Sequence, residues 1–259
     1  MKVKAFKVII LLLIIALFAS GMFNILCVRR AMYYYQALQL SYLDPIGASI
    51  FAAENVCLLE SEPEQVRIIF FGDSRIAHWE PLPFLKNCQL INHGIGGQTT
   101  AQTLLRIKKD IIQLRPAIVV LQVGINDLKT IGIFPQIKND IISSCWKNLN
   151  AIVDQITKND IQVVVLTVFP TGPVSLFRRP IWSNDVCRGV EEINKMIRSL
   201  EGQGITVIDC DSILTSGKSI KTEYVKDTFH LTSAGYEALN NSLNPVLNKL
   251  IQNHLKLEN

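Results

Sequence analysis

The sequence predicts an α/β domain built on a parallel, doubly wound sheet of five strands, with an apolar helix ahead of it. Two observations support this prediction. First, short apolar runs alternate with helical patterns over the roughly 190 residues from Val66 onward, as in right-handed βαβ units. Second, polar or glycine-rich turns follow three of these runs, at the strand ends where open α/β sheets bind ligands.

The five expected strands are short runs rich in β-branched and other apolar residues. They cover 67–71, 89–92, 117–123, 162–167 and 206–209. Five such strands favour the order 2-1-3-4-5, which is the flavodoxin-like arrangement.

Helical spacing of apolar residues predicts the elements between and after these strands. The expected helices cover 99–113, 137–158, 191–201 and 233 to about 251, and Pro245 should kink the last of them.

The first thirty residues contain basic side chains but no acidic ones, and they enclose an apolar run over 8–28. At about 1.5 Å per residue, a helix over this run matches the hydrocarbon thickness of a bilayer. We therefore expect residues 1–30 to form a membrane anchor. The alternative is a signal peptide that is cleaved after the small residues 19–21, giving a secreted protein. Apolar residues continue beyond that point, which favours the anchor.

Three lysines precede the apolar run and two arginines follow it. This imbalance favours a single-pass topology with the amino end inside and the remainder extracytoplasmic, either periplasmic or extracellular. Residues 31–65 are expected to be a juxtamembrane helical region and linker that ends in a Glu- and Pro-containing segment. The globular domain is then expected at 66–259.

The net charge of +4 comes from the flanks of the apolar run. Five of the 26 Lys and Arg residues lie in the first thirty positions, and the remaining 21 nearly balance the 22 Asp and Glu residues. The expected domain therefore has no basic excess, and nucleic acid is not an expected partner.

The polar turns contain residues suited to nucleophilic catalysis. Ser74 follows the first strand, and Asp227 and His230 precede the last helix. A serine hydroxyl is a weak nucleophile until a base accepts its proton, and that base needs an acceptor on its other ring nitrogen. His230 is the candidate base and Asp227 the candidate acceptor.

Attack by a serine on an ester produces an oxyanion, which needs hydrogen-bond donors placed in advance. The backbone N–H groups of Ser74 and Gly97 and the side-chain amide of Asn126 are the candidate donors. All three lie at the carboxyl ends of expected strands, so they should meet at one edge of the sheet.

Each motif alone has a simpler interpretation. Asp73 with Ser74, or Asn126 with Asp127, would serve as a helix cap. The glycines at 94–97 would form an ordinary turn, and they lack the full dinucleotide-binding spacing. The α/β-hydrolase elbow G-x-S-x-G does not surround Ser74 and does not occur elsewhere in the chain.

Taken together and in order, the four motifs closely resemble those of the GDSL, or SGNH, hydrolase family. The matching blocks are Gly72-Asp73-Ser74, the glycine turn 94–97, Gly124-x-Asn126-Asp127 and Asp227-x-x-His230. The resemblance implies a three-layer α/β/α sandwich. It also implies that Ser74 is the nucleophile, that Gly97 and Asn126 complete the oxyanion hole, and that Asp227 and His230 complete the catalytic triad.

The resemblance covers residue 66 to about 248 and is strongest to the branch of acetylhydrolases and carbohydrate O-acetyl esterases. One departure is Gln98, where that branch usually has an acid. This change would affect how the loop is anchored and removes no catalytic group.

The expected function is therefore that of a membrane-anchored serine esterase that forms an acyl-enzyme and needs no cofactor. The expected substrate is a small-molecule, glycan or lipid ester, with an acetyl group on a glycan preferred. Lysophospholipid hydrolysis and acyl transfer to a sugar remain open, as does a non-catalytic, membrane-tethered glycan-binding module. The six cysteines include no C-x-x-C pair, so no metal site is expected. Arg178 or Arg179, between the fourth and fifth strands, would recognise an anionic substrate group, or else both are solvated loop charges.

Overall fold

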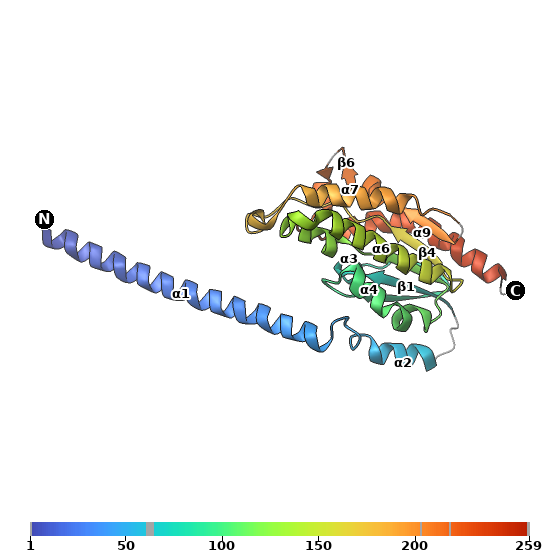
Figure 1. Ribbon diagram of the computed structural model, residues 1–259. Coiled ribbons are helices and arrows are strands. Elements are labelled where there is room, and N and C mark those ends of the chain that lie inside the picture. Colours follow the sequence, from blue (N-terminus) through green and yellow to red (C-terminus); the bar gives the residue numbers. More distant parts are fainter. Residues whose placement is uncertain (1, 61–64, 203, 218, 258–259) are drawn as a thin grey trace. The chain divides into compact units, whose positions relative to one another are not determined.

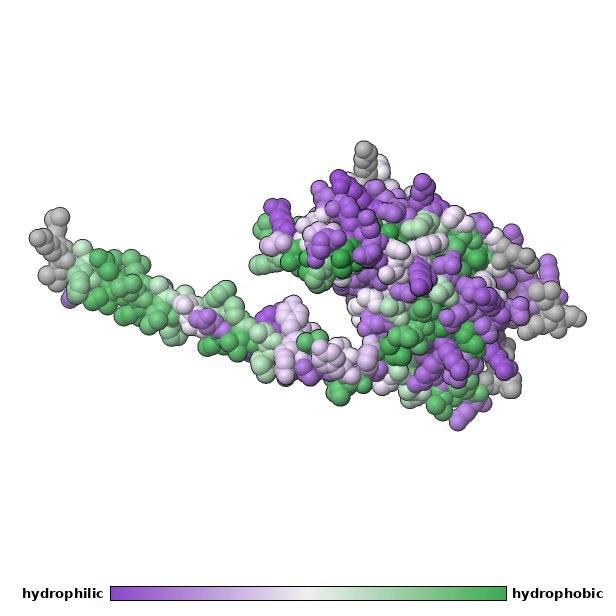
Figure 2. Space-filling view, viewed as in Figure 1, coloured by the Kyte–Doolittle hydropathy of each residue, from purple (hydrophilic) through white to green (hydrophobic). Residues whose placement is uncertain are grey.

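A computed structural model of the chain describes residues 2–60, 65–202, 204–217 and 219–257 (Figure 1). The chain divides into two compact units, one ending at Gly47 and one beginning at Ala48. The first unit is formed by helix α1 (Lys2–Leu43), whose surface is largely apolar (Figure 2). By length and composition, Lys4–Leu43 could cross a membrane, and a signal sequence meets the same criteria.

The second unit is built on a five-stranded sheet in the order β2-β1-β3-β4-β5, and every neighbouring pair is parallel. The strands are β1 (Val66–Gly72), β2 (Cys88–Gly94), β3 (Ile118–Gln122), β4 (Gln162–Leu166) and β5 (Ile205–Ile208). The predicted order 2-1-3-4-5 is therefore confirmed. In register, Gly72 lies opposite both Gly94 and Gln122, so the carboxyl ends of β2, β1 and β3 meet.

Helices cover both faces of this sheet, as Figure 1 shows. They are α2 (Ala52–Glu60), α3 (Ser74–Ala77), α4 (Thr100–Ile107), α5 (Ile125–Leu128), α6 (Lys138–Thr157), α7 (Asp185–Arg198), α8 (Cys210–Leu214) and α9 (Ser233–Leu257). Shorter elements are a π-helical turn (Lys108–Ile112), four 3₁₀ turns (Lys129–Gly132, Pro135–Ile137, Arg179–Ile181 and Thr222–Tyr224) and a small β6–β7 pair (Thr215–Ser216 and Ser219–Ile220).

Successive side chains along each strand point to opposite faces of the sheet, so the core has two layers. Ile69 and Phe71 of β1 belong to the cluster that includes residues of α4, α6 and α7. Ile68 and Phe70 belong to the cluster that includes residues of α8 and α9. A fully buried strand therefore supplies both layers. The three-layer α/β/α arrangement follows.

Three helices differ from the predicted ranges, and the last of them, α9, extends to Leu257, beyond the expected end near 251. The helix expected at 99–113 is α-helical only to Ile107 and continues as the π-helical turn. The helix expected at 191–201 begins earlier, at Asp185. Gly189 weakens the helical pattern there, but a Cβ at this position would lie 3.0 Å from the side chain of Ile131, so glycine allows close packing.

Helix α2 belongs to the same compact unit as the sheet, whereas residues 31–65 are expected from the sequence to lie outside the globular domain. Arg67 of β1 donates a hydrogen bond to the Leu58 carbonyl at 3.0 Å. Leu58 is part of the buried core, and Asn55 is only 2 % exposed. The compact unit therefore begins at Ala48 and not at Val66, because α2 buries its inner face against the domain.

Candidate active site

Ser74 lies two residues beyond the end of β1, where Gly72 packs closely against the backbone of Gln122 in β3. A Cβ at Gly72 would be 1.8 Å from the carbonyl oxygen of Gln122, so only glycine allows this approach. Asp73 then caps α3, because its Oδ1 accepts a hydrogen bond from the Arg75 N–H at 2.9 Å. Ser74 opens the helix, and its own N–H donates to no other residue that the structure describes.

The structure brings Ser74, His230 and Asp227 together. The Ser74 Oγ lies 3.0 Å from His230 Nε2, and His230 Nδ1 lies 2.8 Å from Asp227 Oδ2. The other carboxylate oxygen of Asp227 accepts from the backbone N–H groups of Phe229 and His230, at 2.8 and 3.0 Å. A carboxylate at Nδ1 keeps the proton on that nitrogen and leaves Nε2 facing the hydroxyl.

The electrostatics of Asp227 suit this role. Burial raises the pKa of its carboxyl group, but hydrogen bonds from the Phe229 backbone and from His230 outweigh burial and hold the pKa below its ordinary value. Asp227 is thus a carboxylate at neutral pH, and it stabilises positive charge on the imidazole.

Arg75, directly after Ser74, fixes the loop that carries Asp227 and His230. Its buried guanidinium donates to the carbonyl of Phe229 at 2.9 Å and to that of Phe169 at 3.1 Å. Tyr236 in turn donates its hydroxyl to the Arg75 carbonyl at 2.8 Å. Burial lowers the pKa of Arg75 to about 10, so the group is still a cation at neutral pH.

Gly97 and Asn126 lie at the neighbouring strand ends. Gly97 has φ of +81°, a left-handed conformation that favours glycine, and its N–H donates to no residue in the described ranges. Asn126 Nδ2 donates to the Gln98 carbonyl at 2.9 Å, and Lys129 Nζ donates to Asn126 Oδ1 at 2.6 Å. A side-chain amide has two N–H donors, so the second one of Asn126 remains available.

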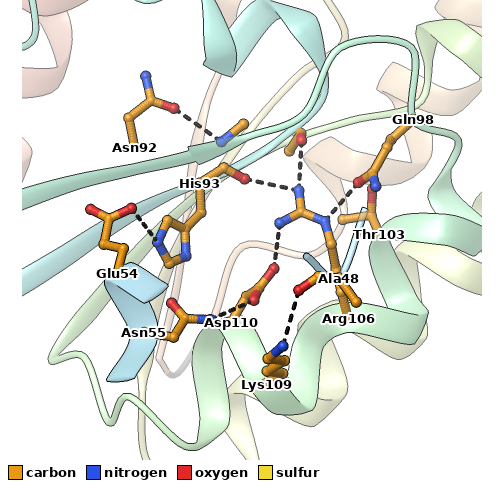
Figure 3. Close-up of polar contacts among 12 residues, drawn as sticks. Ala48, Glu54, Asn55, Asn92, His93, Gln98, Thr103, Arg106, Lys109 and Asp110 are labelled. Carbon is orange, nitrogen blue, oxygen red and sulfur yellow. Dashed lines mark hydrogen bonds and ion pairs between the residues drawn. The ribbon is translucent and has the colours of Figure 1, made fainter. Parts of the chain in front are cut away.

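Gln98 is anchored by a buried network around Arg106 (Figure 3). Arg106 Nε donates to Gln98 Oε1 at 2.6 Å, so an amide oxygen accepts the hydrogen bond where the family resemblance leads us to expect an acid. The same guanidinium donates to Asp110 at 2.8 Å and to the carbonyls of Gly72 and His93 at 2.9 and 2.8 Å. One buried side chain therefore ties the ends of β1 and β2 to the glycine turn.

This network continues to α2. Asn55 donates to Asp110 Oδ1 at 2.9 Å, and Glu54 lies 3.6 Å from the buried ring of His93 (Figure 3). Phe51 stacks on His93 with the ring centroids 4.2 Å apart. A helix that lies before the sheet in sequence thus supports the turn that carries Gly97.

The sequence profile of the GDSL-like lipase/acylhydrolase family matches residues 70–238, which is more than half of the chain. The chain belongs to this GDSL family. It is therefore a serine ester hydrolase by family, and α2 lies outside the part that the profile covers.

Individual relatives of this GDSL protein are distant. The human platelet-activating factor acetylhydrolase IB subunit alpha2 is 23% identical over 208 residues, which cover 76% of this chain and 83% of the relative. A GDSL-like lipase from Bacteroides thetaiotaomicron superposes with a TM-score of 0.66 at 24% identity, covering 79% of this chain and 98% of that one. An acetyl xylan esterase gives 0.57 at 20% identity, covering 70% and 99%. The two structures establish the shared fold.

Sequence reasoning missed Arg75, Arg106 and Lys129 in this GDSL site. The sequence contains a signal for Arg106, because Asp110 follows it four residues later, a spacing that allows an ion pair on a helix. In the structure the two side chains form a buried ion pair. Arg75 and Lys129 adjoin Ser74 and Asn126, but their burial becomes evident only when distant segments are folded together. Within the described part of the chain, no group of three or more His, Cys, Asp or Glu side chains is placed to share a metal ion.

Proposed function

We propose that this chain is a membrane-anchored serine esterase that removes a short acyl group, with acetyl on a glycan preferred, through an acyl-enzyme intermediate. The observation that supports it most directly is the hydrogen-bonded series from Ser74 Oγ through the His230 ring to Asp227. This order of hydroxyl, imidazole and carboxylate is the arrangement that activates a serine for acyl transfer.

In the first half-reaction, Ser74 Oγ attacks the ester carbonyl carbon while His230 Nε2 accepts the hydroxyl proton. The backbone N–H groups of Ser74 and Gly97 and the second amide N–H of Asn126 receive the oxyanion. As the tetrahedral species collapses, the bond to the alcohol breaks and His230 returns the proton to the leaving oxygen. The acyl group remains on Ser74.

In the second half-reaction, water takes the place of the alcohol. His230 removes a proton from the water as its oxygen bonds to the acyl carbon. Collapse breaks the bond to Ser74 Oγ, which recovers its proton from His230, and the carboxylic acid leaves. No electron transfer is involved, so the cycle balances without a cofactor.

The names of two relatives support acetyl as the acyl group. One is an acetyl xylan esterase and the other a platelet-activating factor acetylhydrolase subunit, so both names specify acetyl release. The first name specifies an ester of a glycan, and the second an acetyl ester of platelet-activating factor. The apolar helix α1 favours a lipid ester as the second candidate, because an anchored enzyme works close to a bilayer.

We further propose that α1 remains as a single-pass anchor and places the esterase domain outside the cytoplasm. The support is the length and apolar composition of α1, together with the excess of lysines before its apolar run. Cleavage of the same segment as a signal peptide would give a secreted enzyme with the same site.

The test uses the full-length protein in a neutral detergent, alongside Ser74→Ala. We expect the wild type to release acetate from acetylated xylo-oligosaccharides. It should also hydrolyse 4-nitrophenyl acetate much faster than 4-nitrophenyl esters of longer acyl chains. Both activities should be absent in Ser74→Ala. A preference for long-chain or lysophospholipid esters would favour the lipid alternative. Ester made from an added sugar acceptor would indicate a transferase. Oligosaccharide binding without turnover would contradict the enzyme in favour of a binding module.

A further inference from the structure

Two cationic side chains converge on one aromatic ring beside the candidate oxyanion hole. The ring is that of Phe229, which precedes His230 and is 8 % exposed. The Arg178 guanidinium carbon lies 4.7 Å from the ring centroid, and Lys129 Nζ lies 6.0 Å from it. These cations come from the loop after β4 and from the turn after α5, so the fold brings two separate segments together here.

Lys129 lies next to the reacting centre. Its ammonium donates to Asn126 Oδ1 at 2.6 Å, at the other end of the amide proposed to hold the oxyanion. An ammonium has three N–H donors, so this bond leaves two for another acceptor. Burial lowers the pKa of Lys129, and the positive charge of Arg178 lowers it further. Both cations lie over the same ring, at 6.0 and 4.7 Å from its centroid, and the charge of Arg178 acts unfavourably on that of Lys129.

Arg178 is exposed, and its guanidinium forms no ion pair or hydrogen bond with a side chain in the ranges that the structure describes. The contact with Phe229 is a cation–π interaction, which attracts the guanidinium without neutralising its charge. All five N–H donors of Arg178 thus remain available for a planar anion.

Two carboxylates, those of Asp73 and Asp127, act electrostatically on Lys129 and raise its pKa, but neither is paired with it. Both oxygens of Asp127 accept hydrogen bonds from Thr100, and one oxygen of Asp73 accepts from the Arg75 backbone. The second oxygen of Asp73 is buried and has no hydrogen-bond partner among the described residues. Neither carboxylate forms an ion pair with Lys129 or Arg178 in the described residues. An anion from the substrate would relieve the repulsion between the two cations and use their open donors.

We propose that Lys129 and Arg178 bind an anionic group on the alcohol part of the ester substrate, which makes acidic esters the preferred substrate class. This inference rests on the proposed esterase function. The alcohol part carries the charge because an acetyl group has no room for one. A carboxylate, as on an acidic sugar, and a phosphate, as on a lipid headgroup, share the chemistry that the pair recognises.

The test compares three acetate esters of matched shape: 4-acetoxybenzoate, 4-acetoxyphenyl phosphate and the neutral methyl 4-acetoxybenzoate. For each, kcat/KM is measured with the full-length wild-type protein, with Arg178→Gln and with Arg179→Gln in neutral detergent. Dividing each variant by the wild type cancels the intrinsic reactivity of each ester. Arg179 is the matched control, because it is the adjacent exposed arginine and does not lie over Phe229.

We expect Arg178→Gln to lower kcat/KM about ten-fold for the anionic esters and less than two-fold for the neutral ester. Arg179→Gln should change all three by less than two-fold. In 1 M salt the Debye length is about 3 Å. The preference of the wild type for anionic over neutral esters should therefore fall toward that of Arg178→Gln. The anionic ester whose kcat/KM falls more in Arg178→Gln shows whether the pair prefers a carboxylate or a phosphate. An equal effect of Arg178→Gln on charged and neutral esters would overturn the inference.

A second measurement separates this inference from the proposed function. Calorimetric titration of 4-acetoxybenzoate into Ser74→Ala measures anion binding without turnover. We expect binding that weakens about ten-fold when Arg178→Gln is added. If no ester is hydrolysed by the wild type and this charge-dependent binding persists, the esterase proposal fails and the anion site stands. If the neutral ester is hydrolysed and the titration shows no dependence on Arg178, the anion site fails and the esterase proposal stands.

Discussion

Replacement of Arg106 by lysine should strongly destabilise the domain, although the charge is kept. The guanidinium is 1 % exposed and donates four hydrogen bonds, to Gln98, Asp110, Gly72 and His93. These partners lie in different directions around a planar group. A lysine ammonium is a point donor at the end of a flexible chain and cannot reach all of them.

The size of the effect follows from the acceptors left without a donor. If the ammonium keeps Asp110 and one other partner, two buried oxygens lose their hydrogen bonds, at about 1–3 kcal/mol each. We therefore expect Arg106→Lys to lower the free energy of unfolding by about 2–6 kcal/mol, out of a typical total of about 5–15 kcal/mol. The same change should lower kcat more than it raises KM, because the Gln98 carbonyl holds the Asn126 amide.

The assay is equilibrium urea unfolding of the full-length protein in detergent, followed by tryptophan fluorescence. Arg198→Lys is the matched control, because Arg198 makes a two-pronged pair with Asp209 in which both side chains are more than a third exposed. Exposed pairs contribute about 0–1 kcal/mol, so this variant should unfold close to the wild type. An Arg106→Lys midpoint equal to that of the control would refute the role given to the buried network.

Three further predictions concern the triad, a buried acid and the domain boundary. Asp227→Asn should lower kcat by about 10³–10⁴-fold with little change in the unfolding midpoint, because His230 would lose the acceptor that sets its tautomer. A loss of kcat below about ten-fold in stopped-flow ester assays would contradict this role of Asp227. Burial raises the pKa of Asp73 to about 6, well above the ordinary value of an aspartate, so the folded state binds the proton more tightly than the unfolded state does. Stability therefore falls as pH rises between about 4 and 6. Asp73→Asn keeps a good helix cap, so its free energy of unfolding should equal that of the wild type near pH 4 and exceed it by about 1–3 kcal/mol at pH 7. The same pH dependence of urea unfolding in both proteins would contradict a destabilising buried charge at Asp73. Deletion of residues 1–47 should leave a folded domain, whereas deletion of 1–64 also removes α2 and should lower the melting temperature by more than about 8 °C; equal melting curves for the two deletions would contradict the packing of α2.

The sheet could be predicted because each strand is encoded by a short, continuous stretch of sequence. The five apolar runs are short and bounded by turns, and parallel strands that are buried on both faces read as continuous apolar segments. The strand order follows from the handedness and length of βαβ connections more than from any single residue. The four polar motifs were predictable for the same reason, since each directly follows a strand or precedes the last helix.

The supporting residues were harder to predict because their roles depend on contacts between distant segments. The residues Asn55 and Asp110 are far apart in sequence, yet they form one buried hydrogen bond that places α2 within the domain. Apolar content in 31–65 favours a membrane-proximal helix and a docked helix equally. Lys129 looks like an ordinary surface lysine in a helical turn until the fold places it between the Asn126 amide and the Phe229 ring.

The central claim is that Ser74 is the nucleophile, and covalent labelling tests it most directly. The full-length protein would be treated with a fluorophosphonate, which reacts with activated serines, and the modified peptide would be identified by mass spectrometry. We predict a single adduct on Ser74 that is absent in Ser74→Ala and forms far more slowly in His230→Ala. An unlabelled wild-type protein, or an adduct on another serine that persists in Ser74→Ala, would contradict the mechanism.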